Sequence, residues 1–245
     1  MSFRPQITIL SGEYPGVVLF RYKYWETISW NGQEYPDPRG GSCEIYSEYD
    51  LSLYHASFKV AQTSRTDRRK GSLVGLHFQL PPTGIPDEER QKFLQGKLIT
   101  VNYGRIWDVV VDLRTGTPEN PNPHFGHTQA FLLCDNPSQE LQDDKGAINH
   151  GILYVPPGFG HGFLSVPDDD HTMKGHDGPM CQLIYMLDNA FDVGSQQGIV
   201  WNDPVLHIDW GLKEFGLREE DLIISEKDRR NMTIAEARER NMLPI

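Results

Sequence analysis

Residues 98–114 read LITVNYGRIWDVVVDLR, and this stretch decides the class of fold. Two largely apolar runs, 98–103 and 106–114, flank a Gly104-Arg105 pair that suits a tight turn. An alternation with a period of two residues is typical of a β-strand, so the stretch predicts a β-hairpin. In its second run one face carries Trp107, Val109, Val111 and Leu113, and the other carries Ile106, Asp108, Val110 and Asp112.

Further short strands are predicted on either side of this hairpin. Strands are expected at 17–22, 152–155, 161–166 and 182–187, and a Pro-Pro-Gly turn at 156–158 joins the middle two into a second antiparallel pair. By contrast, the segment RTDRRKG at 65–71 is expected to be a basic, solvated turn. Another strand, GLHFQL at 75–80, places on one face Leu76, Phe78 and Leu80, and on the other His77 and Gln79.

Helix signals are few and lie outside these strands. Residues 86–94 predict one short helix, and TIAE at 233–236 is a capping box that opens another near the C-terminal end. The segments 116–128 and 167–180 are polar and rich in turn residues, so they are expected to be surface loops. Many short strands separated by glycine and proline turns predict an all-β sandwich or jelly roll, formed by a single domain over residues 1–245.

Composition excludes several classes of function. The formal net charge is 23 − 34 = −11, and a negative surface repels phosphate backbones, so no nucleic-acid partner is expected. The three cysteines are widely spaced and form no CxxC pattern, which predicts reduced thiols and a cytoplasmic location. We find neither a signal peptide nor an apolar run that could span a membrane, so no membrane partner is expected.

Five side chains on the predicted strands could carry chemistry. His77 lies on the polar face of its strand, and His161 lies in GFGHGF, where glycines allow a ligand to approach closely. A lone histidine in the position of His77 is more often structural than catalytic, and His161 by itself fits either role. The alternation leaves Asp108 and Asp112 either inside a barrel or on a solvated face, and Tyr185 in QLIYML could be a core residue.

The sequence contains no recognised metal-binding or nucleotide-binding motif. The HxH pattern of metal-binding β-barrels is broken, because Gln79 stands two residues after His77. HExxH, GxSxG, a P-loop and GxGxxG are all absent. His171 and His176 lie in an acidic loop that is expected to be solvated. We therefore expect neither a metal nor a cofactor.

Several segments, taken in order, resemble the dTDP-4-dehydrorhamnose 3,5-epimerase family of RmlC-like cupins. The resemblance covers roughly residues 16–230, and the common order of the motifs makes it specific. The matching segments are DPRGG at 37–41, KGSLVGLHFQ at 70–79, GKLITVNYGRIWDVVVDLRTGTP at 96–118, LYVPPGFGHGFLSV at 153–166, QLIYMLD at 182–188, GIVWNDPVLHIDW at 198–210 and ISEKD at 224–228.

This resemblance implies a fold, an activity and a set of site residues. The fold would be a jelly-roll barrel, in a homodimer whose N-terminal strand crosses to the partner. The activity would be inversion of C3, C5 or both in a nucleotide-linked 4-keto-6-deoxy sugar, by proton transfer through an enolate. The implied catalytic residues are the base His77, the carboxylate Asp228 that orients it, the opposing acid Tyr185, and Lys97 at the C4 oxygen. The implied substrate-binding residues are Arg39, Glu44, Gln79, Asp108 and His161.

The sequence also departs from the family around the site. Val74 stands where an arginine usually precedes GLH, Ser64 stands where an asparagine is usual, and residues 41–43 replace an aromatic run. The loops at 84–94, 116–128 and 167–180 are longer than is typical. Since the four catalytic positions match, we expect the proton chemistry to be retained and the substrate to differ.

Alternatives of three kinds stay open on the sequence alone. A 3-epimerase or a 3,4-ketoisomerase of a related sugar nucleotide would use the same residues. A non-catalytic sugar-nucleotide-binding cupin would keep the barrel without turnover, and a separation of His77 from Asp228 beyond hydrogen-bond reach would favour it. A metal-dependent cupin enzyme would need a ligand set that the sequence lacks, and a metal assay of the purified protein tests it.

Overall fold

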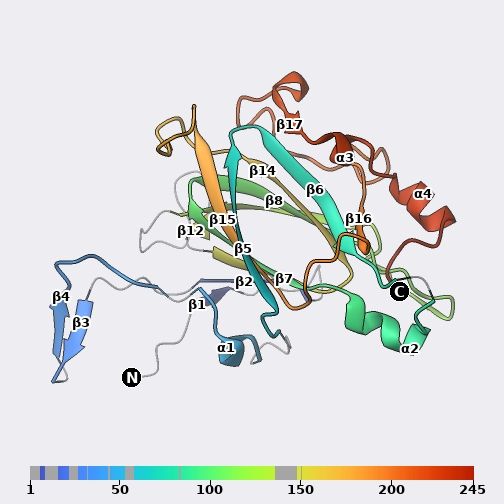
Figure 1. The fold of residues 1–245 in the computed structure, drawn as a ribbon, viewed down its shortest axis with the longest axis horizontal. Helices are drawn as coiled ribbons and strands as arrows, with labels where there is room; N and C mark the ends of the chain where they lie inside the picture. The colour runs from blue at the N-terminus through green and yellow to red at the C-terminus, as the bar shows by residue number, and fades with distance from the viewer. Residues whose placement is uncertain are drawn as a thin grey trace.

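Two β-sheets face each other in the computed structural model, which describes residues 6–8, 16–21, 27–31, 33–43, 45–52, 58–82, 84–135, 148–149 and 151–245 (Figure 1). The first sheet has the order β1 (Gln6–Thr8), β2 (Val18–Arg21), β13 (Gly151–Val155), β7 (Lys97–Tyr103), β15 (Met180–Leu187) and β5 (Gln62–Arg69). The second sheet has the order β12 (Ile148–Asn149), β11 (Thr128–Cys134), β8 (Arg105–Asp112), β14 (Phe159–Ser165), β6 (Ser72–Gln79) and β16 (Gln196–Gly198), with β17 (Ile223–Ile224) also paired to β6.

The fold is the all-β jelly-roll barrel that the sequence predicts. Within these sheets the pairings are antiparallel except for β11 with β12 and β6 with β17. Two small hairpins are formed by β3 (Thr27–Trp30) with β4 (Gln33–Pro36) and by β9 (Gly116–Thr117) with β10 (Asn120–Pro121). The helices are short: α1 (Glu48–Ser52), α2 (Asp87–Arg90), η1 (Gln91–Phe93), η2 (Glu219–Asp221), α3 (Glu226–Arg229) and α4 (Ile234–Glu239).

The helix predictions are confirmed. The helix expected at 86–94 is present as α2 and η1. At the start of α4 the Thr233 hydroxyl accepts a hydrogen bond from the Glu236 N–H, and the Glu236 carboxylate accepts one from the Thr233 N–H, as the capping box requires. No helix in the described part of the chain is long and apolar enough to cross a membrane.

Each predicted strand is present, but both predicted hairpin pairings are wrong. β7 pairs with β13 and β15, whereas the next strand, β8, lies in the other sheet and pairs with β11 and β14. β13 and β14 are likewise consecutive strands in opposite sheets. The Gly104 turn and the Pro-Pro-Gly turn at 156–158 are therefore corners between sheets. A turn signal marks where the chain reverses, and it does not say which strand becomes the neighbour.

The prediction of a basic solvated turn at 65–71 is also wrong, because most of this segment belongs to β5. β5 pairs along its whole length with β15, from Gln62 opposite Leu187 to Arg69 opposite Met180. The strand has no apolar alternation, since the face that lines the cavity carries the polar residues Thr66 and Arg68 and the other face is largely exposed. A pattern search based on hydrophobicity cannot find such a strand.

Buried apolar side chains form three layers around and between the sheets. One fills the barrel between the two sheets and includes Ile99, Val110 and Phe163. Another covers the outer face of the second sheet, where the C-terminal segment contributes Trp201 and Ile234. The third covers the outer face of the first sheet. Full burial of one such large side chain contributes about 1.5–3 kcal/mol, so the C-terminal segment is held firmly on the second sheet.

Asp203 anchors that C-terminal segment. Its carboxylate is only 3% exposed and accepts hydrogen bonds from the backbone N–H groups of Val205 at 2.8 Å, Leu206 at 3.1 Å and Ile234 at 2.7 Å. Ile234 is the first residue of α4, so one side chain joins two parts of the segment in which Asp228 lies.

Asp203→Ala is expected to lower the free energy of unfolding by at least about 2 kcal/mol, because three backbone N–H groups, those of Leu206 and Ile234 buried, lose the acceptor that they have among the described residues. Urea unfolding measures the change. Asp209→Ala is the matched control: this exposed carboxylate accepts one N–H, from Gly211 at 2.8 Å, and its loss should cost less than about 1 kcal/mol. Equal unfolding midpoints for the two variants would contradict the anchoring role.

Candidate active site

A β-bulge in β6 shapes one wall of the barrel cavity. His161 on β14 lies opposite His77, and Phe163 lies opposite Val74, so three steps on β6 match two steps on β14. Gly75 makes the bulge possible, since its φ is +111° and a Cβ there would lie 2.6 Å from the Gly162 Cα. The bulge allows both Val74 and His77 to line the cavity, although they are three positions apart, a spacing that would place them on opposite faces of a regular strand.

His77 forms a short hydrogen bond with Asp228. The Nε2 of His77 lies 2.6 Å from the Asp228 Oδ1, and Asp228 reaches it from α3, whose N-cap is Ser225. The Gly75 N–H also donates to Asp228, at 3.5 Å. Asp228 is therefore held in place by both the bulge and the C-terminal segment. The His77–Asp228 distance is within hydrogen-bond reach, so the separation that would favour a non-catalytic barrel is not observed.

The pKa values of this pair favour a neutral imidazole beside an ionised carboxylate. Burial lowers the pKa of His77, because it penalises the imidazolium more than the Asp228 hydrogen bond favours it, and nearby Lys97 and Lys227 act in the same direction. Burial raises the pKa of Asp228, but its hydrogen bonds to His77 and Gly75 outweigh burial and the pKa is lowered. The Nε2–H therefore donates to Asp228, and Nδ1 keeps its lone pair; Nδ1 has no hydrogen-bond partner among the described residues.

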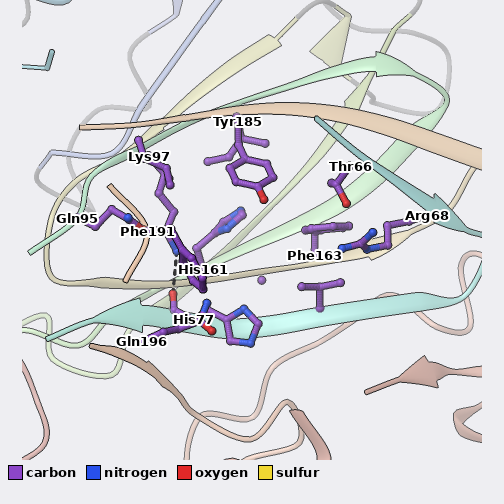
Figure 2. Close-up of a pocket in the computed structure, with 14 residues that line it drawn as sticks. Thr66, Arg68, His77, Gln95, Lys97, His161, Phe163, Tyr185, Phe191 and Gln196 are labelled. Atoms are coloured by element: carbon purple, nitrogen blue, oxygen red, sulfur yellow. Dashed lines mark hydrogen bonds between the residues drawn. The ribbon is translucent and has the colours of Figure 1, made fainter. Parts of the chain in front are cut away.

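Lys97 lies at the end of β7 and points into the same cavity. Its Nζ donates to the backbone carbonyl of His77 at 3.0 Å, as the dashed line in Figure 2 marks. Burial lowers the pKa of Lys97 to about 8, and the Asp108 carboxylate opposes that shift. Because this pKa lies close to neutral pH, a negative charge that forms near the Lys97 ammonium group would favour its charged form.

Tyr185 faces His77 from the opposite wall. Tyr185 is on β15 in the first sheet, whereas His77 is on β6 in the second, and both line the cavity (Figure 2). The Tyr185 hydroxyl has no hydrogen-bond partner among the described residues. A group lying between the two walls could therefore meet an imidazole on one side and a phenol on the other.

A second histidine–aspartate pair lies beside the first. The Nε2 of His161 is 2.8 Å from the Asp108 Oδ2, and Asp108 is fully buried. Asp112 is also fully buried and pairs with Arg114. Of the two alternatives for Asp108 and Asp112, the position inside the barrel is therefore correct and the solvated face is wrong. They face inward because β8 is covered on both sides.

Two of the remaining predicted binding residues, Arg39 and Gln79, are not among the residues that line this cavity. Arg39 is exposed in the turn after β4 and pairs with Asp37 at 2.8 Å. Gln79 is buried behind the wall, where its Oε1 accepts a hydrogen bond from Gln95 at 3.4 Å. Glu44 lies outside the described residues.

Several lining residues were not predicted from the sequence. β5 contributes two of them, which escaped notice because β5 was taken for a turn. Gln95 and Phe191 come from loops outside any motif, whereas Phe163 lies on β14 and Gln196 on β16. The unpredicted polar and aromatic lining residues are Thr66, Arg68, Gln95, Phe163, Phe191 and Gln196.

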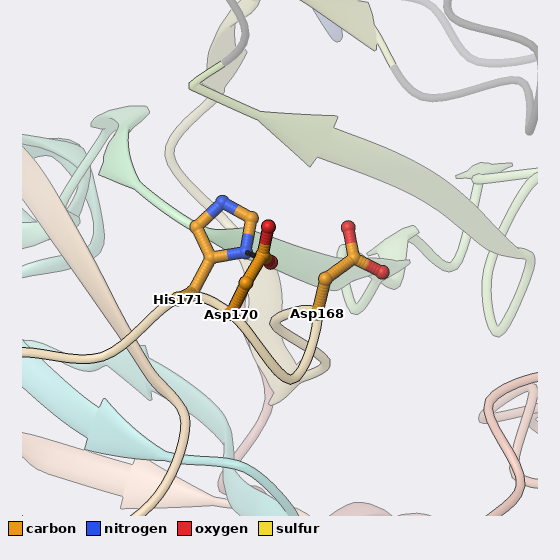
Figure 3. A group of neighbouring side chains, drawn as sticks. All are labelled: Asp168, Asp170 and His171. Atoms are coloured by element: carbon orange, nitrogen blue, oxygen red, sulfur yellow. Dashed lines mark ion pairs between the residues drawn. The ribbon is translucent and has the colours of Figure 1, made fainter.

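A cluster of possible metal ligands lies away from this cavity, in the loop after β14 (Figure 3). Asp168, Asp170 and His171 bring one ligand atom each to within 4.8 Å of one another. Asp168 already pairs with the buried Arg105, and His171 lies 3.4 Å from Asp170. Each of these three side chains therefore has a partner within the protein.

A jelly-roll barrel whose cavity is lined by two histidines, each bonded to an aspartate, together with a lysine and a tyrosine, belongs to the cupin class. Comparison with known proteins gives the particular family. The family model for dTDP-4-dehydrorhamnose 3,5-epimerase matches residues 24–236. The chain therefore belongs to the dTDP-4-dehydrorhamnose 3,5-epimerase family, and its classification as an isomerase acting on carbohydrates is confirmed.

Individual relatives support the same assignment. The chain is 32% identical to a dTDP-4-dehydrorhamnose 3,5-epimerase of Streptomyces griseus over 214 residues, which cover 86% of this chain and 83% of that one. It is 30% identical to the Pseudomonas aeruginosa enzyme, with coverage of 86% and 93%. The Legionella pneumophila epimerase, solved with dTDP-4-keto-L-rhamnose, shares the fold with a TM-score of 0.68 at 23% identity, and the match covers 98% of each chain.

Proposed function

We propose that the chain is an epimerase of a nucleotide-diphospho-4-keto-6-deoxy sugar and inverts C3, C5 or both. One observation carries the proposal: an imidazole backed by a carboxylate at 2.6 Å faces a tyrosine from the opposite sheet across one cavity. Inversion of a carbon needs a base on one face and a proton donor on the other, and this arrangement supplies both.

The proposed reaction uses only side chains of the cavity. A ketone at C4 makes the protons on C3 and C5 acidic, because the charge left by deprotonation spreads onto the C4 oxygen. His77 Nδ1 removes the proton from one face, and Asp228 stabilises the imidazolium that forms. Tyr185 then delivers a proton to the opposite face of the enolate, which inverts the carbon.

Lys97 is proposed to stabilise the enolate. Its ammonium group would lie near the C4 oxygen, where negative charge develops, and a cation already held in a buried position needs little reorganisation there. His161 is proposed to contact the substrate next to His77, since it lies directly opposite His77 on β14. Asp108 is proposed to take part in binding through the His161 imidazole that it holds.

Solvent deuterium uptake tests this function directly. The purified protein is incubated in deuterated water with a panel of nucleotide-linked 4-keto-6-deoxy sugars, and the products are analysed by mass spectrometry. Label at both C3 and C5 supports the double epimerase, whereas label at C3 alone supports the narrower 3-epimerase. If no member of the panel takes up label, the proposal fails and a non-catalytic binding protein is favoured.

The pH dependence of kcat/KM is expected to be bell-shaped. The base must be neutral, so the rate should rise with pH through the lowered pKa of His77 and reach its plateau near or below the ordinary histidine value. Lys97 must be charged, so the rate should fall as pH rises through about 8. kcat/KM reports the free enzyme, which is the state described here.

Lys97→Met checks the assignment of the alkaline limb. This variant should be slower at neutral pH and should show no decline around pH 8, because the titrating cation is gone. The controls are Lys174→Met, which changes an exposed loop lysine, and a thermal melt of each variant. An alkaline limb that persists unchanged in Lys97→Met would assign it to another group.

We also propose that the chain works as a homodimer in the cytoplasm. The β3–β4 hairpin stands away from the two sheets (Figure 1), and the exposed Arg39 follows it, so this segment is free to reach a second subunit. Light scattering should then give about twice the chain mass of 28.0 kDa. A monomer at working concentration would contradict the proposal.

A further inference from the structure

We propose that Arg68 binds the diphosphate of the substrate, in place of the guanidinium that is missing at Val74. The inference rests on the proposed function and specifies which residue of this chain recognises the charged part of a sugar nucleotide.

Arg68 is placed in the cavity by its strand. It lies on β5 directly opposite Cys181 of β15, and Thr66, two residues earlier on the same face, is opposite Leu183. Both Thr66 and Arg68 line the cavity, whereas Arg69 is exposed on the other face of the strand. The partly buried guanidinium is thus directed inward by the period of the strand.

The charge of Arg68 is not neutralised by the protein described here. Its Nη1 donates to the backbone carbonyl of Asp67 at 2.8 Å, and among the described residues no carboxylate forms an ion pair with it. The guanidinium therefore keeps donors for a ligand. A planar guanidinium presents parallel N–H groups that match two oxygens of a phosphate group.

On the wall formed by the second sheet, two apolar residues line the cavity near the bulge. Val74 and Phe163 face each other across the β6–β14 ladder, and both line the cavity. The family resemblance implies an arginine at the position of Val74, on the second sheet, whereas this chain presents its guanidinium from Arg68 on the first sheet. The two positions face one cavity, which permits the exchange.

The spacing along the cavity suits a sugar nucleotide. Figure 2 shows Lys97 and Arg68 at opposite ends, with Tyr185 between them. Tyr185 and Cys181, the residue opposite Arg68, are four positions apart on β15, or roughly 13 Å at the rise of a β-strand. That length places the hexose ring between His77 and Tyr185 and directs the phosphates at C1 toward Arg68.

Calorimetric titration of Arg68→Gln tests this inference. The ligand is whichever of dTDP, UDP, CDP and GDP the wild-type protein binds most tightly, and the matching nucleoside serves as a probe without phosphates. Arg68→Gln is expected to weaken the nucleoside diphosphate by roughly 10- to 100-fold, the loss typical of a hydrogen bond to a charged group. Nucleoside binding should change less than about twofold. In turnover, KM should rise while kcat stays within about threefold, because Arg68 lies away from the reacting carbons.

Two further variants separate this role from a structural one. Arg69→Gln removes an exposed arginine from the same strand and should leave both affinities unchanged. Arg68→Gln combined with Val74→Arg returns a guanidinium from the opposite wall and should recover at least about tenfold in nucleoside diphosphate affinity. A folded Arg68→Gln protein that binds the nucleoside diphosphate within twofold of wild type overturns the inference but leaves the proposed function standing. A wild-type protein that neither binds these nucleotides nor exchanges deuterium overturns the proposed function itself.

Discussion

Replacing His77 with alanine is expected to abolish deuterium exchange into the substrate, a loss of roughly 10³-fold or more, because the proposed base is removed. Within the described part of the cavity, His77 is the imidazole paired with the carboxylate at 2.6 Å and facing Tyr185 from the other sheet. Mass spectrometry of the substrate after incubation in deuterated water measures the loss.

The design must separate lost chemistry from lost structure. His77→Ala leaves the buried Asp228 without one partner, so His77→Gln is made alongside it to keep a polar group near the carboxylate. His176→Ala, in an exposed loop, is the matched control and should exchange at the wild-type rate. If a folded His77 variant exchanged within tenfold of wild type, His77 would not be the base.

Asp228→Asn is expected to slow exchange by roughly 10²- to 10⁴-fold, in the range of acid–base contributions, without removing the imidazole. The carboxylate holds the Nε2–H tautomer and stabilises the imidazolium that forms. An amide carries no charge, and its NH₂ group can donate to Nε2, which would move the ring proton to Nδ1 and block the base. The single substitution therefore affects the tautomer and the charge together.

A shift in the pH profile identifies this mechanism specifically. The Asp228 hydrogen bond and charge raise the pKa of His77 against the effect of burial. Their loss should move the acid limb of kcat/KM to lower pH while the plateau falls. Asp221→Asn is the control, because it makes the same chemical change at an exposed carboxylate that pairs with Arg218 at 3.1 Å. An Asp228→Asn variant that kept both its rate and its acid limb would show that Asp228 does not act on His77.

The elements of this fold could be predicted where the sequence has a local pattern. Strands covered by apolar residues on at least one face, such as β6 and β8, show alternation or a continuous apolar run. β5 shows neither, because its inward face carries the polar side chains of Thr66 and Arg68 into the cavity. A strand of this kind is visible only after its partner β15 is in place.

The residues of the candidate site also fall into two groups, those expected from sequence motifs and those that only the structure reveals. His77, Lys97, His161 and Tyr185 were expected from motifs, and the structure brings them to one cavity. Arg68 and Gln95 could not be expected, since neither belongs to a motif and each reaches the cavity only through the packing of its element. The catalytic roles themselves stay predictions until the exchange experiments are done.

The sequence by itself determined the strands with apolar patterns, the capped helix at Thr233, the residue types needed for proton transfer and the family. Only the tertiary structure decided that consecutive strands lie in opposite sheets and that Arg68 faces the cavity. The pairing of His77 with Asp228, 151 residues away, was implied by the family resemblance, and the structure supplies its geometry. The physical reason is the range of the interactions. Turn formation and alternation depend on a few neighbouring residues, whereas the pairing of strands and the burial of charged side chains depend on how distant segments pack into the barrel.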